Sequence, residues 1–180
     1  AVTQNLVHDE HMLLEEPIYG QGIPPSPRIM FVPWLAHQAM LSVLTGVDPV
    51  DMMFAWRLPI IILSLGAMYR LARSISHKRK AAALAVLAWG IYLLVTARSD
   101  VARSYPGYDI AVRPDLDKII AGFSLVPVVL GLVLDSFRQT TGRAYIKLLL
   151  GSVAAGLMHP LGVGLVGLSL LGFGVLELVF

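Results

Sequence analysis

The sequence predicts an all-α protein: a polytopic bundle of transmembrane helices with interfacial helices in its first extracytoplasmic loop. The first observation is composition, because 56% of the 180 residues are hydrophobic and only 14% are charged, whereas soluble domains contain about 25% charged residues. The second is a mean hydropathy of +0.71, which comes from apolar runs of membrane-crossing length. The third is that Lys and Arg gather in short clusters between those runs, as topology signals do.

Charge and cysteine content exclude several other classes. The formal net charge of +2 does not favour nucleic acid as a partner, whereas membrane lipid is expected from the apolar runs. The chain has no cysteine, which excludes a disulfide framework and a thiolate metal site. Because the chain opens on polar residues at Ala1 and ends within an apolar run at Phe180, we expect a fragment of a longer membrane protein.

The first predicted domain, residues 1–47, is an extracytoplasmic loop. A short amphipathic helix is predicted over 2–14, and it should end before Pro17, because a residue that precedes proline avoids the helical region. An irregular loop rich in Gly and Pro follows.

The apolar segment 29–46 closes this domain and leaves two alternatives open. It could cross the membrane, although its length is near the lower limit of about 17–25 residues. It could instead lie in the interface, with one face in lipid and one in water. Because Pro33, His37 and Gln38 interrupt the apolar pattern, we favour the interfacial position.

The second predicted domain, residues 48–180, is the transmembrane bundle. Asp48-Pro49 predicts a helix start, with an N-cap followed by proline in the first turn. His159-Pro160 predicts a break between the last two apolar runs. The predicted crossings are approximately 52–71, 81–97, 116–137, 146–158 and 161–180.

The basic connections predict the orientation. Loops 73–80 and 138–147 carry Lys and Arg without acids, so the positive-inside rule assigns both to the cytoplasm. Loop 98–118 and the break at His159 are then outside. The acidic N-terminal patch is also outside if 29–46 is interfacial, and it is cytoplasmic if 29–46 crosses the membrane. The interfacial alternative brings one polar set to the outer face: Asp9, Glu10, Arg28, His37, Arg57, Arg103, Tyr108 and His159.

The acidic pair Asp9-Glu10, within His8-Asp9-Glu10-His11, is the candidate catalytic centre. A carboxylate at the membrane surface can act as a general base. It can also hold Mg²⁺ or Mn²⁺, which prefer oxygen ligands; Asp9, Glu10 and His159 are the candidate metal ligands. The alternative is a solvated helix start, since acids favour helix N-termini.

The cationic candidates suit a lipid-linked phosphate. Arg57, early in the first confident crossing, is expected at headgroup depth, where its guanidinium can form two parallel hydrogen bonds to phosphate; the alternative is an arginine that extends to lipid headgroups. Arg28 and Arg103 are weaker candidates of the same kind. His159 could bind a phosphate, a sugar hydroxyl or a metal, or simply end a helix.

Two further binding candidates have a structural alternative of their own. His37 lies on the predicted interfacial helix, where a histidine often serves packing. Tyr108 lies in the loop 98–118, where it could instead anchor the chain at the interface.

The order of these parts resembles the C-type (GT-C) polytopic membrane glycosyltransferases, the group that includes protein O-mannosyltransferases and lipid A aminoarabinose transferases. Asp9-Glu10 match the acidic motif that opens the first extracytoplasmic loop in that family. The stretch from Pro25 to Trp34 is similar to its turn and second interfacial helix, and Leu157-Met158-His159-Pro160 is similar to a His-Pro break after a later crossing. The family's first crossing and its C-terminal acceptor domain are not represented.

The resemblance implies sugar transfer with inversion from a polyprenyl-phosphate-linked donor to an acceptor outside the cytoplasm. The acidic residue would be the base, and a divalent cation would be possible. The implied location is the bacterial inner (plasma) membrane with the active face outside the cytoplasm. The sugar and the acceptor are not specified, and this fragment alone is expected to be inactive.

Two other classes compete with an enzyme. A transporter or flippase module would use the polar loops and the break at His159-Pro160 as parts of a translocation path, but no inverted repeat is evident and the acids lie outside the crossings. In a non-catalytic membrane scaffold subunit, Asp9-Glu10 would only be solvated. A cavity that opens to one side of the membrane distinguishes the enzyme from both.

Overall fold

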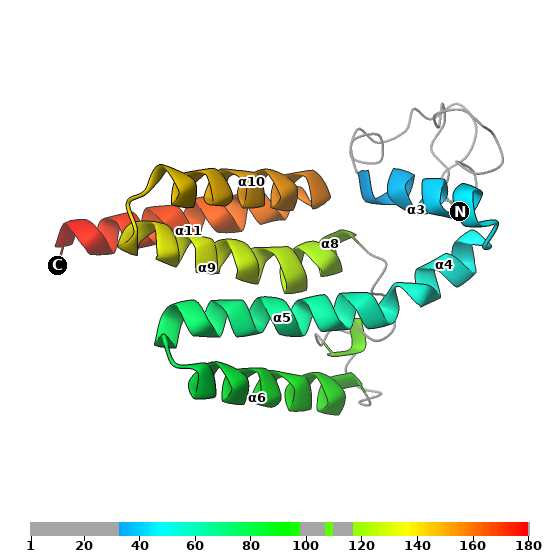
Figure 1. Cartoon of the computed structure of the whole chain (residues 1–180), viewed down its shortest axis with the longest axis horizontal. Helices are drawn as coiled ribbons and strands as arrows, with labels where there is room; N and C mark the ends of the chain where they lie inside the picture. The colour runs from blue at the N-terminus through cyan, green and yellow to red at the C-terminus, as the bar shows by residue number, and fades with distance from the viewer. Residues whose placement is uncertain (1–32, 98–106, 110–116, 180) are drawn as a thin grey trace. The chain divides into compact units, whose positions relative to one another are not determined.

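The computed structural model describes residues 33–97, 107–109 and 117–179. Within these ranges it is helical and contains no strand, so the predicted all-α class is confirmed for this part of the chain. The chain divides into two compact units, residues 1–56 and 57–180. Besides a helical turn at 107–109, the elements are α3 (Pro33–Thr45), α4 (Pro49–Ala55), α5 (Arg57–Ser76), α6 (Arg79–Ala97), α8 (Asp117–Ile120), the π-helix η1 (Ala121–Leu125), α9 (Val126–Arg138), α10 (Gly142–Met158) and α11 (Pro160–Val179) (Figure 1).

In the first unit, α3 packs against α4 across a tight connection. α3 ends at Thr45, and Gly46 follows it with a φ of 69°, a conformation that glycine adopts without steric cost. The Gly46 N–H donates to the Ser42 carbonyl at 2.9 Å. α4 begins with the predicted cap: the Asp48 carboxylate accepts from the Val50 N–H at 2.8 Å, and Pro49 is the first helical residue. The predicted helix start at Asp48-Pro49 is therefore confirmed.

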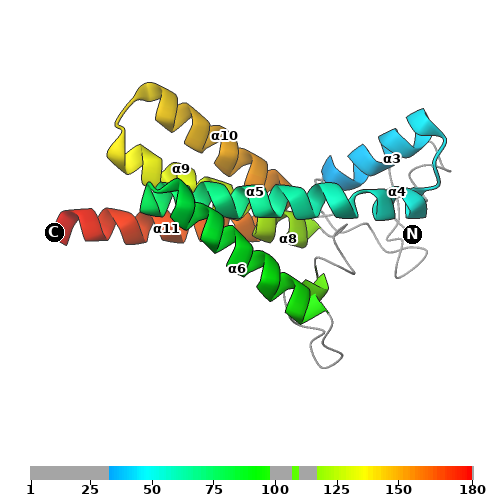
Figure 2. The ribbon, with the colours of Figure 1, turned by 60° about the horizontal axis from the view of Figure 1, so that its bottom comes forward.

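In the second unit, helices that follow one another in the chain run in opposite directions, so α5, α9 and α11 are parallel to one another and α6 and α10 run the other way (Figure 1). α5 packs against both α6 and α9, and α9 also packs against α10 and α11 (Figures 1 and 2). The turn after α5 uses His77 at a φ of 58°, with its N–H bonded to the Arg73 carbonyl at 2.9 Å. α10 begins at the Thr141 cap, and its break from α11 falls at His159-Pro160, as the sequence predicts.

Apolar side chains form a core around α9. Val129 and Val133 on α9 are almost fully buried, together with Ala155 on α10 and Val166 on α11. A second, smaller cluster joins Leu93 of α6 to Ile119 of α8. Many large apolar side chains face outward instead, and Leu94 is 71% exposed. An exterior with extensive exposed apolar surface is typical of a surface that is covered by lipid or by a partner.

Three helical segments are long and apolar enough to cross a membrane: Pro49–Ser76, Arg79–Ala97 and Asp117–Arg138. They correspond to the first three predicted crossings. The first includes a turn at Trp56 between α4 and α5, and the third contains η1; the sequence analysis predicted neither feature. The helix of the fourth predicted crossing, 146–158, starts at Gly142 rather than at Ile146, because Thr141 caps it.

That the last two apolar runs, 146–158 and 161–180, cross the membrane remains a prediction. α10 is helical over 17 residues and α11 over 20. Within α11, Gly162–Val175 is an apolar helical stretch shorter than the three candidate spans.

The close contact between α10 and α11 predicts opposite effects for two alanine substitutions in α11. A Cβ at Gly162 would lie 2.7 Å from the Ala155 carbonyl oxygen, whereas a Cβ at Gly167 would meet nothing within 4 Å. Gly162→Ala should therefore destabilise the protein by about 1–3 kcal/mol through overpacking. Gly167→Ala should stabilise it by about 0.5–1 kcal/mol, because alanine loses less backbone entropy in a helix.

Unfolding of the detergent-solubilised protein, followed by circular dichroism, measures both effects. Equal stabilisation by the two substitutions would mean that α10 and α11 do not approach each other at Gly162.

Candidate functional site

Four of the predicted site residues lie outside the described residues. They are Asp9 and Glu10, the predicted catalytic acids, together with Arg28 and Arg103. Their roles stay predictions.

His37 lies in the first unit and belongs to an aromatic cluster with Trp34 and Trp56. The His37 ring stacks on Trp34 at a centroid distance of 5.9 Å, and Trp34 meets Trp56 edge-on at 5.2 Å. The third pair, His37 and Trp56, is also 5.9 Å apart. A Trp–Trp pair such as Trp34–Trp56 is worth about 0.5–1.5 kcal/mol beyond area burial. The cluster therefore gives His37 a packing role, the structural alternative in the sequence analysis.

Three other predicted residues, Arg57, Tyr108 and His159, lie at one end of the second unit. α5 begins at this end with Arg57, α6 finishes there, and His159 lies there between α10 and α11 (Figures 1 and 2). The antiparallel order of the helices causes this grouping, because every second helix end must fall on the same side. The two basic connections, after α5 and after α9, fall at the opposite end.

The segment that carries Tyr108 is held against the end of α6. The Gly107 N–H donates to the Thr96 hydroxyl at 3.1 Å, and that hydroxyl donates to the Tyr92 carbonyl at 2.7 Å. A Cβ at position 107 would overlap Thr96 and lie 2.7 Å from the Ala97 nitrogen. Only glycine fits this close to the end of α6, so Gly107 determines the position of the neighbouring residue, Tyr108.

An apolar groove of about 230 Å³ lies between α5 and α6 at the same end. Gly90 leaves room in its wall, since a Cβ there would approach only Leu65, at 3.9 Å. Arg57 precedes the groove residue Ile61 by four positions, so the two are neighbours on the surface of α5. The groove is lined by Ile61, Leu65, Gly90, Leu93, Leu94, Ala97 and Gly107.

This groove was not predicted from the sequence. Its one available signal was Gly90, a glycine inside an Ala- and Leu-rich helical run, which often marks a close approach or a packing reason. The other lining residues are apolar and cannot be distinguished from core residues by pattern alone.

His159 is 8% exposed and ends α10 in an extended conformation. Its N–H donates to the Ala155 carbonyl at 3.0 Å, and its own carbonyl accepts from the Gly162 N–H at 2.8 Å. The backbone of His159 thus links the last turn of α10 to the first turn of α11, which supports the helix-end role. Its side chain is held at the same end of the unit as Arg57.

Within the described ranges, no three His, Asp or Glu side chains are grouped so that they could hold a metal ion. His159 is the one predicted metal ligand in those ranges, and Asp9 and Glu10 lie outside them. The predicted divalent cation therefore remains a prediction.

Comparisons of this chain with protein-family models, with curated proteins and with solved structures found no match.

Substitution of Thr96 tests how the Tyr108 segment is held. Thr96→Val keeps the shape of the side chain but removes the acceptor for the Gly107 N–H. Hydrogen–deuterium exchange at residue 107 should become about tenfold faster, because a net hydrogen bond is worth about 0.5–1.5 kcal/mol.

Ser152→Ala is the matched control, because the Ser152 hydroxyl donates only within α10, to the Leu148 carbonyl at 2.8 Å. Unchanged exchange at residue 107 in Thr96→Val would contradict the proposed tether.

Proposed function

We propose that this chain belongs to an integral membrane glycosyltransferase that moves a sugar from a polyprenyl-phosphate-linked donor to an acceptor outside the cytoplasm. The observation that carries the proposal is the apolar groove between α5 and α6, one helical turn from Arg57. An isoprenoid chain needs an apolar groove and its phosphate needs a cation at the groove's mouth. The guanidinium of Arg57 is suited to that phosphate.

Charge distribution supports an orientation with this end outside the cytoplasm. Arg73 and the basic run from His77 to Lys80 belong to the opposite end of the second unit, as do Arg138 and Arg143. The positive-inside rule assigns such connections to the cytoplasm. The groove, the Tyr108 segment and His159 would then lie on the outer side.

The sequence of α3 supports an interfacial position for the segment before the bundle, because Pro33, His37 and Gln38 interrupt its apolar pattern. With α3 in the interface, the acidic pair Asp9-Glu10 would be in the same compartment as His159.

The chemistry follows from those positions. Asp9 would take the proton of the acceptor hydroxyl, whose oxygen forms a bond to the anomeric carbon. The bond from that carbon to the phosphate oxygen breaks, and the polyprenyl phosphate leaves with the electron pair. Arg57 and His159 would neutralise the charge that develops on the leaving phosphate. Glu10 would orient the acceptor or share a divalent cation with Asp9.

The location of Asp9 can be tested without background, because the chain contains no cysteine. A single cysteine at position 9 should react with a membrane-impermeant maleimide added from outside the cytoplasm, as should a reference cysteine at position 109. A cysteine at position 78 should react only in inverted vesicles. Labelling of position 9 from the cytoplasmic side would remove the proposed site.

Loss of the base should abolish transfer without loss of the protein. Asp9→Asn should lower the rate of sugar transfer by about 10²–10⁴-fold, the usual contribution of a general base. Asp51→Asn is the matched control, because Asp51 is an exposed acid in the first turn of α4. Transfer of a labelled sugar from a polyprenyl-phosphate donor in native membranes measures both, and normal turnover by Asp9→Asn would refute the assignment.

A further inference from the structure

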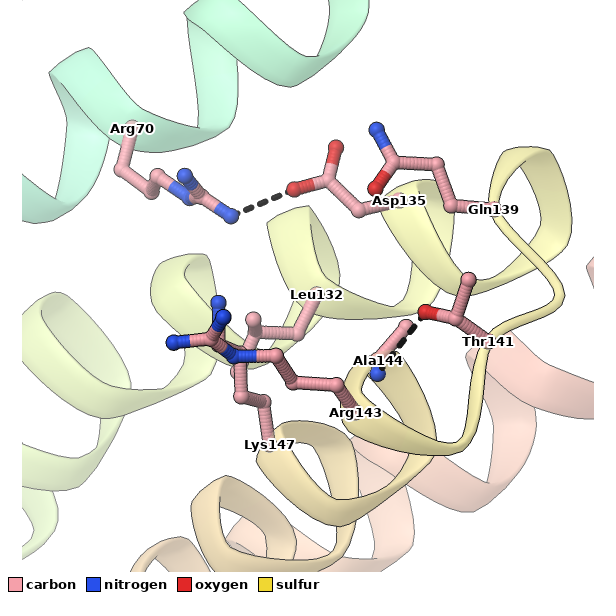
Figure 3. A pocket seen from close by; sticks show the side chains of 8 residues that line it. All are labelled: Arg70, Leu132, Asp135, Gln139, Thr141, Arg143, Ala144 and Lys147. Atoms are coloured by element: carbon pink, nitrogen blue, oxygen red, sulfur yellow. Dashed lines mark hydrogen bonds and ion pairs between the residues drawn. The ribbon is translucent and has the colours of Figure 1, made fainter.

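A polar pocket lies at the opposite end of the second unit from Arg57. It has a volume of about 220 Å³ and opens where α5, α9 and α10 meet (Figure 3). This is several times the ~30 Å³ that one water molecule occupies in the liquid, so a phosphate group fits. The pocket is lined by Arg70, Leu132, Asp135, Gln139, Thr141, Arg143, Ala144 and Lys147.

The pocket has an excess of positive charge. Three of its side chains are cationic and one is anionic, which leaves two positive charges in excess. The guanidinium of Arg70 reaches from α5 to the carboxylate of Asp135 on α9 and pairs with it (Figure 3). Within the described ranges, Arg143 and Lys147 have no carboxylate partner.

The two remaining cations are four residues apart on α10. They share one face of the helix, where like charges repel and destabilise it. An anion bound between them would remove that repulsion.

The walls of the pocket are fixed before any ligand binds. Two backbone hydrogen bonds close the turn from α9 to α10. The Gln139 N–H donates to the Asp135 carbonyl at 2.8 Å, and the Thr141 N–H donates to the Gln139 carbonyl at 2.7 Å. The Thr141 hydroxyl then caps α10 by accepting from the Ala144 N–H at 3.3 Å. Across the interface, Arg138 donates to the Ser74 carbonyl and holds α9 on α5.

The surface beside the pocket is apolar. Along α10, Ile146 and Leu150 are each at least 60% exposed, and each lies three residues after a pocket cation, on the same face of the helix. Apolar side chains below a cationic pocket match the two parts of a phospholipid, its acyl chains and its headgroup. A soluble anion would use only the cations.

We propose that the pocket between α5, α9 and α10 binds the phosphate of an anionic phospholipid, with Arg143 and Lys147 as its ligands. Basic pockets between transmembrane helices on the cytoplasmic side hold anionic headgroups by this chemistry. Arg70 lines the site while it remains paired to Asp135. The proposal does not depend on sugar transfer, since it uses the other end of the helices.

Native mass spectrometry of the purified protein, loaded with phosphatidylglycerol or with phosphatidylcholine, tests the site. The wild-type protein should retain phosphatidylglycerol preferentially. R143Q/K147Q should bind it on the order of thirtyfold more weakly, because each basic residue near an anionic lipid strengthens binding about fivefold. R79Q/K80Q is the matched control: it removes the same charge from the same end of the unit, outside the pocket, and should bind as the wild type does.

The charge-preserving R143K/K147R variant should retain binding and so separates loss of charge from loss of fold. Equal weakening by the two neutralising pairs, or no preference for phosphatidylglycerol, would overturn the proposal. Competition by inorganic phosphate as strong as that by the lipid would assign the pocket to a soluble anion and would overturn the lipid assignment.

Discussion

The packing of α9 against α5, α10 and α11 is the constraint on which the second unit depends. Val129 and Val133 bury this face of α9 almost completely. Gly131 lets α9 approach α5, since a Cβ there would lie 3.3 Å from the Ser74 hydroxyl. The ion pair between Arg70 and Asp135 fixes the register at one end. With α9 held in this way, the directions of α10 and α11 follow from the short turns after α9 and after α10.

This antiparallel order separates two kinds of chemistry. The short turns after α5 and α9 put most of the Lys and Arg residues at one end, where few acids are present to neutralise them. The other end has Arg57 and the Tyr108 segment near the apolar groove between α5 and α6, and it has His159 between α10 and α11. To bring the two proposed phosphate-binding regions to one end, a connection would have to be long enough to reverse the direction of a helix, and the turns after α5 and α9 are too short for that.

Periodicity and caps made much of this fold predictable. The all-α class, the cap at Asp48-Pro49 and the break at His159-Pro160 depend on local chemistry, and the structure has each of them. The π-helix at Ala121–Leu125 does not follow from the apolar pattern, because that pattern is equally compatible with an α-helix. The π-helix packs against α5 and α10 and continues directly into α9. The groove could not be predicted for a similar reason: a wall of Leu and Ile has the same pattern whether it encloses a cavity or a core.

The candidate site was only partly predictable, because sequence order gives the end of a helix at which a residue lies and not what its side chain contacts. Topology alone predicts that Arg57 and His159 share an end. It does not predict that Asp135, which the sequence places at the cytoplasmic end of its helix, pairs with Arg70, since they are 65 residues apart in the chain. That pairing has a consequence for function. It neutralises one cation of the basic pocket and leaves Arg143 and Lys147 as the charges available to an anion, so a contact that stabilises the fold also determines which residues can bind lipid.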